Sequence, residues 1–559
     1  MTRVRLVRPR GAKRIGGGSL TAVLLAIGLL SPFRLPGEEL RTVAEASGFS
    51  RTSLHAEVVR FLEQVAARSP RVKLLTLGVS SEGRPIPLVV VSREGIAGVA
   101  QLRAVRRPAV LVMGGIHAGE IEGKEACQML VRDLALAADD DLLKDQVVLF
   151  LPIFNPDGNE KLGHNRRDNG PELAGVRQNG QNLDLNRDYM KLESPEVTAL
   201  ASLLSTWDPT LVIDVHTTNG SYHDEPVTYT TMAHPATDPA LRDFMWGKLF
   251  PAATRELKAQ GFESVPYGNF VDHDLPGQGW ANDSVDARYG SNYVGLRNRF
   301  TVLVEIYSYA DFPTRVRSSY AFVKAMLRYT AGHLGEMAEL AARIDRDLIA
   351  RGLTGEYPVK YRMESLFDVT LHLSPASLPP PRSTGGKPLP EKMVAAYATP
   401  RSLRLPYLAR AVAESSVALP EGYVILPGST EALATLRRHG IVVERFAEGW
   451  SAVAENYQLS TVKPAGGIYQ GRVLTQVTGQ YVTGNWDIPA GAWYVSLRQP
   501  LARLIPALLE PESTDSLLAW GAFNRVIVQQ WNPRPGVYPV LRLAARPPVA
   551  TTVVPPGPD

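Results

Sequence analysis

Three residues of this sequence could meet at one metal ion. His117 and Glu120 lie in AVLVMGGIHAGEIEGKEACQML, where an apolar strand-like run gives way to a helical one, and His216 ends the apolar run TLVIDVH. An imidazole and a carboxylate spaced His-x-x-Glu across such a turn can reach one point. Two histidines and one glutamate form a catalytic zinc set that leaves a fourth position open for water. We therefore predict one Zn²⁺ per chain, held by His117, Glu120 and His216.

The elements that must position these residues alternate along the first 350 positions. Apolar strand-like runs are expected at Ile86–Ser92, Ala109–Met113, Val147–Pro152, Thr210–Val215 and Thr301–Ile306. Helices are expected at Ser53–Ala67, Glu120–Ala137, Pro195–Trp207, Pro239–Gln260 and Arg315–Ile349. Strands alternating with helices predict an α/β domain with a mixed, largely parallel central sheet and helices on both faces. Binding residues should then gather at the carboxyl ends of the strands.

The chain divides near residue 355 on this interpretation. We expect a catalytic domain at 36–355, a Pro-rich connecting segment at 356–395 that includes SPASLPPPRSTGGKPLP, and a smaller accessory domain at 396–559. Tyr423–Phe446 has a strand–helix–strand pattern, and 456–500 is rich in Tyr, Val, Thr and Gly. The accessory domain is therefore expected to be α+β or β-rich.

The N-terminal segment 1–35 has the pattern of an export signal or a membrane anchor. Basic residues crowd positions 3–14, and a short apolar core, SLTAVLLAIGLL, follows them. The core is too short to span a bilayer comfortably, and no clear cleavage site follows. We expect an exported domain, periplasmic, extracellular or anchored outside the cytoplasm, with membrane contact only through this segment if it is uncleaved.

Composition removes several other classes of protein. The chain has 559 residues, a net charge of +4 and 21% charged residues, and much of its basic excess lies in the N-terminal segment. Nucleic-acid binding therefore has little support. The single cysteine, Cys127, excludes an intrachain disulfide framework, and it is expected to pack in the core. The sequence has neither a Gly-x-Ser-x-Gly elbow nor a glycine-rich phosphate loop.

Four segments together resemble the zinc metallocarboxypeptidases, which remove one residue from the C-terminus of a peptide. They are residues 109–130, LPIFNPDGNE at 151–160, VRQNGQNLDLNRDYM at 176–190, and TLVIDVH at 210–216. They occur in the order of the family and cover roughly residues 65–330. The resemblance implies a peptide substrate with a free C-terminal carboxylate.

The resemblance also implies roles for single residues. Asp184 matches the carboxylate that accepts a hydrogen bond from the first histidine ligand. Asn186 and Arg187 match the pair that captures the terminal carboxylate, for which a planar guanidinium is suited. Arg177 would polarise the scissile carbonyl and stabilise the oxyanion. Arg166 and Arg167 are competing candidates for that role, although a solvated surface position suits these two better.

Two further roles come from the same resemblance. Glu305, in the apolar run FTVLVEIYSY, matches the general base that takes a proton from the water at the zinc and passes it to the leaving amine. A mobile tyrosine caps the substrate in the family, and here Tyr289 and Tyr293 are both candidates. The run Asn-Arg-Asp-Tyr departs from the family pattern, which leaves the pocket around the clamp open. His223 is expected to lie in the cleft without binding metal.

Three functions remain open at this point. The first is a zinc-dependent carboxypeptidase. The second is a zinc-dependent deacylase that cleaves the amide of an N-acyl amino acid. The third is a non-catalytic peptide- or cell-wall-binding protein on the same scaffold. The Asn-Pro-Asp-Gly run and the spacing of Arg177 favour the peptidase.

Overall fold

The computed structural model describes residues 40–554, apart from 138–140, 166–168, 219–220, 273–275, 283, 380–387, 529–530 and 532–533. The predicted export signal or anchor therefore lies outside the described residues. From Leu40 onward the chain forms one compact unit. Among the described residues, no helix is both long enough and apolar enough to cross a membrane.

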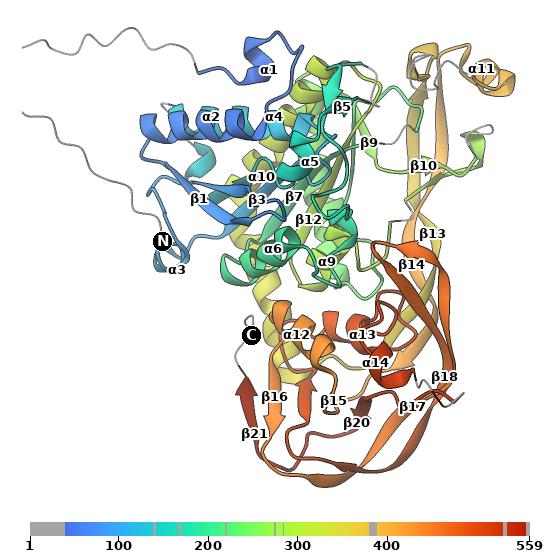
Figure 1. The fold of residues 1–559 in the computed structure, drawn as a ribbon. Helices are drawn as coiled ribbons and strands as arrows, with labels where there is room; N and C mark the ends of the chain where they lie inside the picture. Colours follow the sequence, from blue (N-terminus) through green and yellow to red (C-terminus); the bar gives the residue numbers. More distant parts are fainter. Residues whose placement is uncertain are drawn as a thin grey trace, which may run out of the picture. The chain divides into compact units, whose positions relative to one another are not determined.

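The centre of the first half is an eight-stranded mixed sheet in the order β1-β2-β4-β3-β7-β12-β8-β9 (Figure 1). The strands in that order are β1 (Val72–Val79), β2 (Pro85–Val91), β4 (Val147–Leu151), β3 (Ala109–Gly114), β7 (Leu211–Thr217), β12 (Phe300–Ile306), β8 (Val227–Thr230) and β9 (Ser264–Pro266). The four central strands β4, β3, β7 and β12 run parallel to one another. Antiparallel pairs flank them on both sides. The predicted fold class is thus confirmed.

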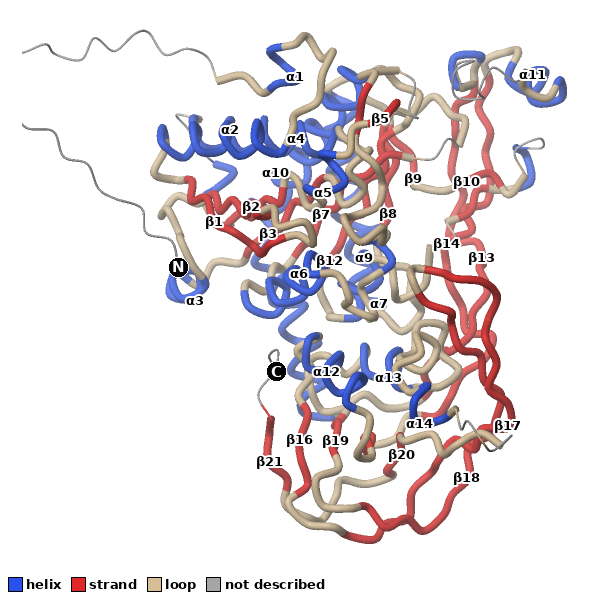
Figure 2. Tube along the Cα trace, in the orientation of Figure 1, coloured by secondary structure: helices blue, strands red, loops and turns tan. Residues whose placement is uncertain are grey.

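Helices cover both faces of this sheet (Figure 2). One face packs against α2 (His55–Arg68), α4 (Glu122–Leu136), α8 (Phe250–Ala259) and α10 (Phe312–Arg351). The other face packs against α6 (Pro195–Thr206) and α9 (Gly290–Leu296). In β3, Val110 and Val112 join the first cluster, whereas Leu111 and Met113 join the second. Burial on both faces explains why the central strands are continuously apolar in sequence.

Capping residues mark where the helices α6 and α10 begin. Ser194 caps α6 by accepting a hydrogen bond from Val197 N, and a proline fills the first helical position. Asp311 caps α10 in the same way. The single helix expected at Pro239–Gln260 is instead α7 (Pro239–Phe244) and α8, joined through a π-helical turn at Met245–Leu249.

The expected connecting segment at 356–395 is more ordered than its proline content suggests. Its first 18 residues form β13 (Glu356–Leu373), which pairs along its length with β14 (Arg401–Ala418). These two strands join β10 (Asn269–Phe270) and β11 (Trp280–Ala281) in a four-stranded sheet. Val369, Leu371 and Leu373 are buried and alternate with the polar Thr370 and His372, which is the period of a half-buried strand. A short helix, α11 (Glu391–Tyr397), precedes β14.

A seven-stranded sheet forms most of the C-terminal part, in the order β18-β17-β20-β15-β19-β16-β21. Its strands are β18 (Arg472–Ile488), β17 (Trp450–Tyr469), β20 (Val540–Leu543), β15 (Gly422–Ile425), β19 (Trp493–Ser496), β16 (Val443–Phe446) and β21 (Thr551–Val554). The predicted strand–helix–strand is β15, α12 (Thr430–Arg438) and β16. The C-terminal part is β-rich, as predicted.

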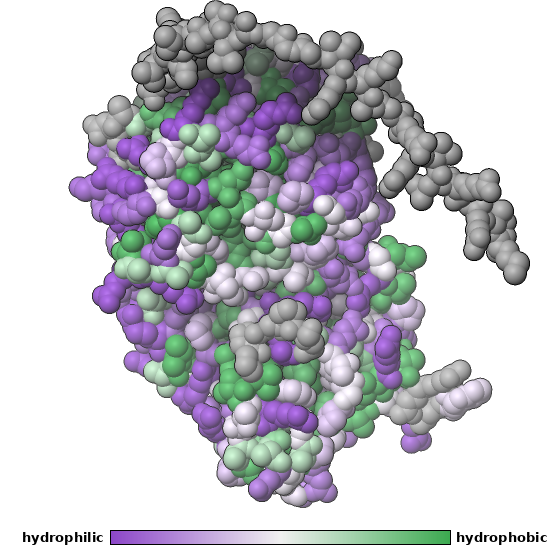
Figure 3. Space-filling view, turned by 60° about the vertical axis from the view of Figure 1, so that its left-hand side comes forward, coloured by the Kyte–Doolittle hydropathy of each residue, from purple (hydrophilic) through white to green (hydrophobic). Residues whose placement is uncertain are grey.

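The C-terminal part shares a buried hydrophobic cluster with the helices on one face of the central eight-stranded sheet. Leu200 of α6 and Tyr293 of α9 belong to the same buried cluster as Leu436, Ile441 and Leu504. On the face drawn in Figure 3, polar and apolar residues are interspersed, as is ordinary for a folded surface. The shared core joins the C-terminal part to the helices next to the candidate site.

Candidate active site and metal centre

The candidate site lies where the parallel strands β3, β7 and β12 end. His117 follows β3, Glu120 precedes α4, His216 is near the end of β7, and Glu305 is near the end of β12. Glu305 and His216 are direct partners in the parallel register of β12 and β7. The carboxyl ends of parallel strands therefore gather the catalytic candidates at one edge, as expected for an α/β sheet.

A tight junction brings β3 close to α4. A Cβ atom on Gly114 would lie 2.7 Å from the backbone carbon of Gly123, so the strand and the helix approach too closely for any side chain there. Gly115 follows with a φ of +70°, a conformation that glycine adopts without strain. The glycine pair in GGIHAGE thus places His117 and Glu120 beside each other.

The three predicted zinc ligands converge. Nδ1 of His117 lies 3.1 Å from Oε1 of Glu120, and Nδ1 of His216 lies 3.0 Å from Oε2 of the same carboxylate. One ligand atom from each residue falls within 4.8 Å of the others, and all three side chains are buried. Within the described part of the chain, this is the only group of three His, Cys, Asp or Glu residues that meets this distance.

Each histidine is held from behind by a second carboxylate. Nε2 of His117 lies 2.9 Å from Oδ1 of Asp184, and Nε2 of His216 lies 2.9 Å from Oδ2 of Asp214. In a neutral imidazole that donates through Nε2–H, Nδ1 is an acceptor. Both Nδ1 atoms then face Glu120, which is also an acceptor. Three lone pairs directed at one point suit a divalent cation, and two nitrogens with one carboxylate suit zinc.

Carboxylates around the histidines shift the pKa values at the site. Burial alone would lower the pKa of His216, but the carboxylates of Asp214 and Glu120 raise it well above its usual range. Burial would raise the pKa of Asp184, yet its hydrogen bond with His117 and the charges of Arg177 and Arg187 hold that pKa well below its usual value. The excess of carboxylate around the histidines is what a dication would balance.

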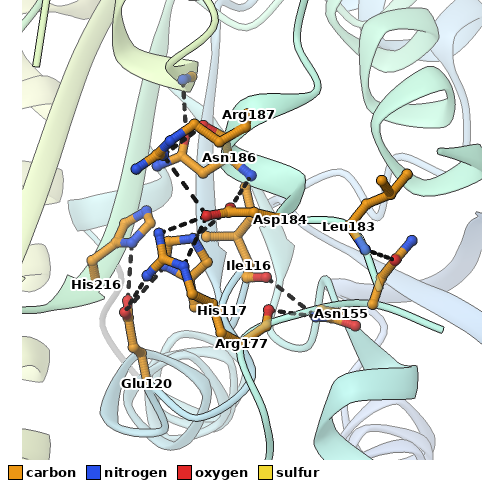
Figure 4. Close-up of polar contacts among 12 residues, drawn as sticks. Ile116, His117, Glu120, Asn155, Arg177, Leu183, Asp184, Asn186, Arg187 and His216 are labelled. Atoms are coloured by element: carbon orange, nitrogen blue, oxygen red, sulfur yellow. Dashed lines mark hydrogen bonds and ion pairs between the residues drawn. The ribbon is translucent and has the colours of Figure 1, made fainter. Parts of the chain in front are cut away.

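Arg177 lies beside the metal group, by which we mean His117, Glu120 and His216. Its Nε donates to Oδ2 of Asp184 at 2.8 Å, and its Nη1 lies 3.5 Å from Oε1 of Glu120 (Figure 4). Burial lowers the pKa of Arg177, but the charges of Asp184, Glu120 and Glu305 raise it above its ordinary value. A fixed cation therefore lies beside the metal group, where an oxyanion would need one.

Asn186 and Arg187 lie on the other side of Asp184. Asn186 N donates to Oδ1 of Asp184 at 2.9 Å, and Oδ1 of Asn186 accepts from Gly290 N at 2.9 Å. The guanidinium of Arg187 lies 4.2 Å from the centre of the Tyr289 ring. Arg187 keeps 20% of its side chain exposed, so its fork can reach a ligand.

Two cavities meet at the metal group. A small one of about 60 Å³ is lined by Asn186, Arg187, Tyr289 and Glu305, among other residues. A larger one of about 430 Å³ is lined by His164, Gln178 and Tyr309, among others. His117, Glu120 and Arg177 line both. A ligand that crosses the metal group would have a long part on one side and a short part on the other.

The structure separates the two tyrosines that the sequence leaves open. Tyr289 lines the small cavity. Tyr293 is fully buried, and its hydroxyl lies 2.9 Å from Nδ1 of His439 and 3.2 Å from Arg297. Tyr293 therefore belongs to the core beneath α9, whereas Tyr289 precedes that helix with an extended backbone. The prediction of Tyr293 as a substrate contact is not supported by this position.

Several site residues escape the sequence patterns. Asp214 orients His216, and an acid two positions before a histidine in an apolar strand was the signal for it. Tyr267, Ser284 and Ser291 also line the small cavity; the first two lie in irregular segments, and Ser291 lies in the first turn of the short helix α9, which is not among the helices expected from the sequence.

Other candidates lie elsewhere. His223 is fully buried, with Nδ1 3.4 Å from Glu225, and lines neither cavity. Arg166 and Arg167 lie outside the described residues. Cys127 is buried in α4, and burial raises the pKa of its thiol, which disfavours the nucleophilic thiolate.

The sequence is similar to those of known carboxypeptidases. Residues 58–273 match the family model described as zinc carboxypeptidase. Carboxypeptidase 2 of Trichophyton equinum is 24% identical over 493 residues, which cover 83% of this chain and 81% of the relative. Mouse carboxypeptidase Z is 36% identical over 185 residues, which cover 30% of this chain and 27% of the relative.

Solved structures include a metallo-carboxypeptidase from Pseudomonas aeruginosa in complex with (2-guanidinoethylmercapto)succinic acid. It is 20% identical, with a TM-score of 0.39, and the match covers 51% of this chain and 70% of that one.

Proposed function

We propose that this chain acts as a metallocarboxypeptidase through the zinc carboxypeptidase domain that residues 58–273 match. The substrate is a peptide with a free C-terminal carboxylate, and the products are the shortened peptide and one amino acid. His117, Glu120 and His216 hold one Zn²⁺. When bound at such a site, zinc lowers the pKa of water and polarises a carbonyl group.

Asn186 and Arg187 bind the terminal carboxylate of the substrate in this proposal. The amide and the guanidinium both lie at the small cavity, and the planar guanidinium can hold a carboxylate through two hydrogen bonds. The rest of the peptide extends through the larger cavity. The scissile bond is then held next to the metal group, one residue away from the clamp.

Glu305 acts as the general base. It lines the small cavity and is the register partner of His216, so its carboxylate lies beside the metal ligands without being one of them. It removes a proton from the attacking water and gives that proton to the leaving amine. Arg177 stabilises the oxygen that becomes negative when the carbonyl is attacked.

One observation carries the proposal. The carboxylate-binding pair and the metal group are joined through a single side chain, Asp184, which accepts from His117, from Arg177 and from the backbone of Asn186. The distance between the clamp and the metal is thereby fixed. A fixed distance of this kind selects the last peptide bond of a chain over internal ones.

A substrate panel tests this function. The full-length zinc protein is incubated with one peptide in three forms, with a free, an amidated and a D-residue C-terminus, beside a set of N-acyl amino acids. We expect release of the last residue from the free L-form and little from the amidated form. Hydrolysis of the N-acyl amino acids alone would replace the proposal with a deacylase, and binding without any hydrolysis would replace it with a peptide-binding protein.

We also propose that the domain works outside the cytoplasm, from the basic and apolar pattern of residues 1–35. Fractionation of cells that express the full chain should find the folded domain in the periplasm, in the medium or at the outer side of the membrane. A full-length product confined to the cytosol would contradict export.

A further inference from the structure

The strands β17 and β18 of the C-terminal part form a long hairpin with an unusual turn. Tyr469 pairs with Arg472, which leaves Gln470 and Gly471 as a two-residue turn. Both have positive φ, +51° and +74°. Such turns favour Asn-Gly, because at positive φ the Cβ atom crowds the backbone carbonyl. Glycine has no Cβ, and the short polar side chain of asparagine offsets the crowding by local hydrogen bonds. Glutamine here is a local strain, and strain of this kind marks a position to examine for function.

Gln470 contacts the candidate site directly. Its Oε1 accepts a hydrogen bond from the backbone N of Asp184 at 2.9 Å, across 286 positions of sequence. A Cβ atom on Gly471 would lie 3.8 Å from the Leu183 side chain, so the turn also lies against the preceding residue. The backbone of Asp184 is thus fixed by the hairpin while its carboxylate serves His117, Arg177 and Asn186.

The hairpin tip is itself firmly anchored. Arg472 forms ion pairs with Glu193 and Glu431 and donates to the Trp520 carbonyl at 2.8 Å. The Tyr469 ring stacks on the Trp520 ring, with 6.0 Å between centroids and 23° between planes. The turn therefore cannot shift freely, and Gln470 presents its amide at a defined point.

The C-terminal part also contacts the segment that carries Tyr289, a residue of the small cavity. Asp515 accepts from the backbone N of Arg288 at 2.9 Å and pairs with its Nε at 2.9 Å. The Arg288 guanidinium lies 5.6 Å from the Tyr469 ring and 5.5 Å from the Trp520 ring. Tyr289 follows directly and contacts Arg187. The segment that carries Asn186 and Arg187 and the segment that carries Tyr289 are therefore both tied to the C-terminal part.

We propose that Gln470 is a positioning residue for terminal-carboxylate recognition, through which the C-terminal part sets the place of Asp184, Asn186 and Arg187. The inference rests on the proposed function. On this inference the C-terminal part has a role in substrate binding although it gives no group to the substrate. Its contribution is one amide oxygen, from Gln470, that accepts from the backbone N–H of Asp184.

The test uses three variants of the full-length zinc protein. Gln470→Ala removes the acceptor. Gln470→Asn suits the turn better but is one methylene too short to reach Asp184. Gln476→Ala is the matched control, because it removes an exposed glutamine from the same hairpin. Two readouts are followed: KM and kcat for peptides with free and amidated C-termini, and hydrogen exchange of the backbone around Asp184.

For Gln470→Ala and Gln470→Asn we expect a two- to tenfold rise in KM for the free-acid peptide, about the value of one hydrogen bond. We expect little change in kcat, in zinc content or in the rates on the amidated peptide. Exchange at Asp184 should become faster. The Tm of Gln470→Asn should be no lower than that of the wild type, and Gln476→Ala should match the wild type throughout.

The combination in Gln470→Asn separates positioning from simple stability. A KM that rises while Tm holds supports the inference. A KM that changes only in step with Tm, or unchanged KM and unchanged exchange at Asp184 in both Gln470 variants, overturns it. If the wild-type protein hydrolyses no peptide, the proposed function fails, and the exchange measurement alone then decides whether Gln470 holds Asp184.

Discussion

Two buried clusters in this chain are built from similar side chains, but only one of them has a hydrogen-bond donor for every acceptor. In the C-terminal part, each oxygen of Glu510 accepts from a tyrosine hydroxyl, Tyr423 or Tyr481, at 2.6 Å, and from the guanidinium of Arg542. Glu510 is fully buried and Arg542 is 5% exposed. Every acceptor faces a donor, so the cluster is complete as it stands.

In the cluster at the carboxyl ends of β3, β7 and β12, two imidazole nitrogens that are acceptors in the neutral ring face a carboxylate, which is also an acceptor. Glu120 faces Nδ1 of His117 and of His216, while Asp184 and Asp214 occupy the opposite nitrogens. It also adjoins two cavities. A buried polar cluster that lacks positive charge and opens to a cavity can bind a cation and a ligand. A cluster in which every acceptor has a donor stabilises the core instead.

The largest effect should come from the base beside the open cluster. Glu305→Gln keeps the shape of the side chain but removes the proton acceptor, so kcat should fall by about 10²–10⁴-fold. Zinc content should stay near that of the wild type, as measured by metal analysis, because Glu305 is not a ligand. Glu120→Gln is the control, in which zinc and activity should fall together. Normal turnover in Glu305→Gln would remove the proposed mechanism.

The saturated cluster should respond in stability and not in chemistry. Glu510→Gln turns an amide N–H₂ toward donors and leaves Arg542 buried without its carboxylate, which should cost about 3–5 kcal/mol in the free energy of unfolding. Urea unfolding followed by circular dichroism measures this. Glu512→Gln, at an exposed neighbour that accepts from Tyr457, should change stability by about 0.5 kcal/mol or less.

The folded fraction of Glu510→Gln should retain zinc at the wild-type level. Loss of zinc with little loss of stability would mean that the two clusters are not independent, and the contrast between them would fail.

A smaller effect is expected at the carboxylate clamp. Losing a charge-assisted hydrogen bond costs about 1.5–3 kcal/mol, so Arg187→Ala should lower kcat/KM for a free-acid peptide by about ten- to a hundredfold. The amidated peptide, which has no terminal charge, should lose much less. Equal losses on the two peptides would show that Arg187 acts in another way.

The sequence carries the central sheet because its strands are buried on both faces. Ile86–Ser92, Ala109–Met113 and Val147–Pro152 are continuous apolar runs, and the observed strands lie within one residue of these limits. Strand β1 at the sheet edge is only partly buried and has no such run. The end of the long strand β13 alternates Val369, Leu371 and Leu373 with polar residues, which is a strand pattern, but the Pro-rich stretch that follows it favours a loop.

Site residues could be predicted from the sequence where they are close to one another along the chain, and not where only the fold brings them together. His117 and Glu120 are three positions apart, so local spacing alone places them together. Tyr293 follows Tyr289 by four positions, yet the direction of each side chain depends on where α9 begins, which local composition does not determine. Gln470 lies 286 positions from Asp184, and only the folding of the hairpin onto the catalytic part brings them into contact.

The most direct test of the central claim is zinc add-back. Metal-free full-length protein is titrated with Zn²⁺, and bound zinc and the release of the last residue from a free-acid peptide are measured in parallel. We expect release to rise with bound zinc and to level off at about one zinc per chain. A His117→Ala, His216→Ala double variant should neither bind zinc at this site nor release the last residue. Full release without zinc, or one tightly bound zinc in the double variant, would contradict this claim.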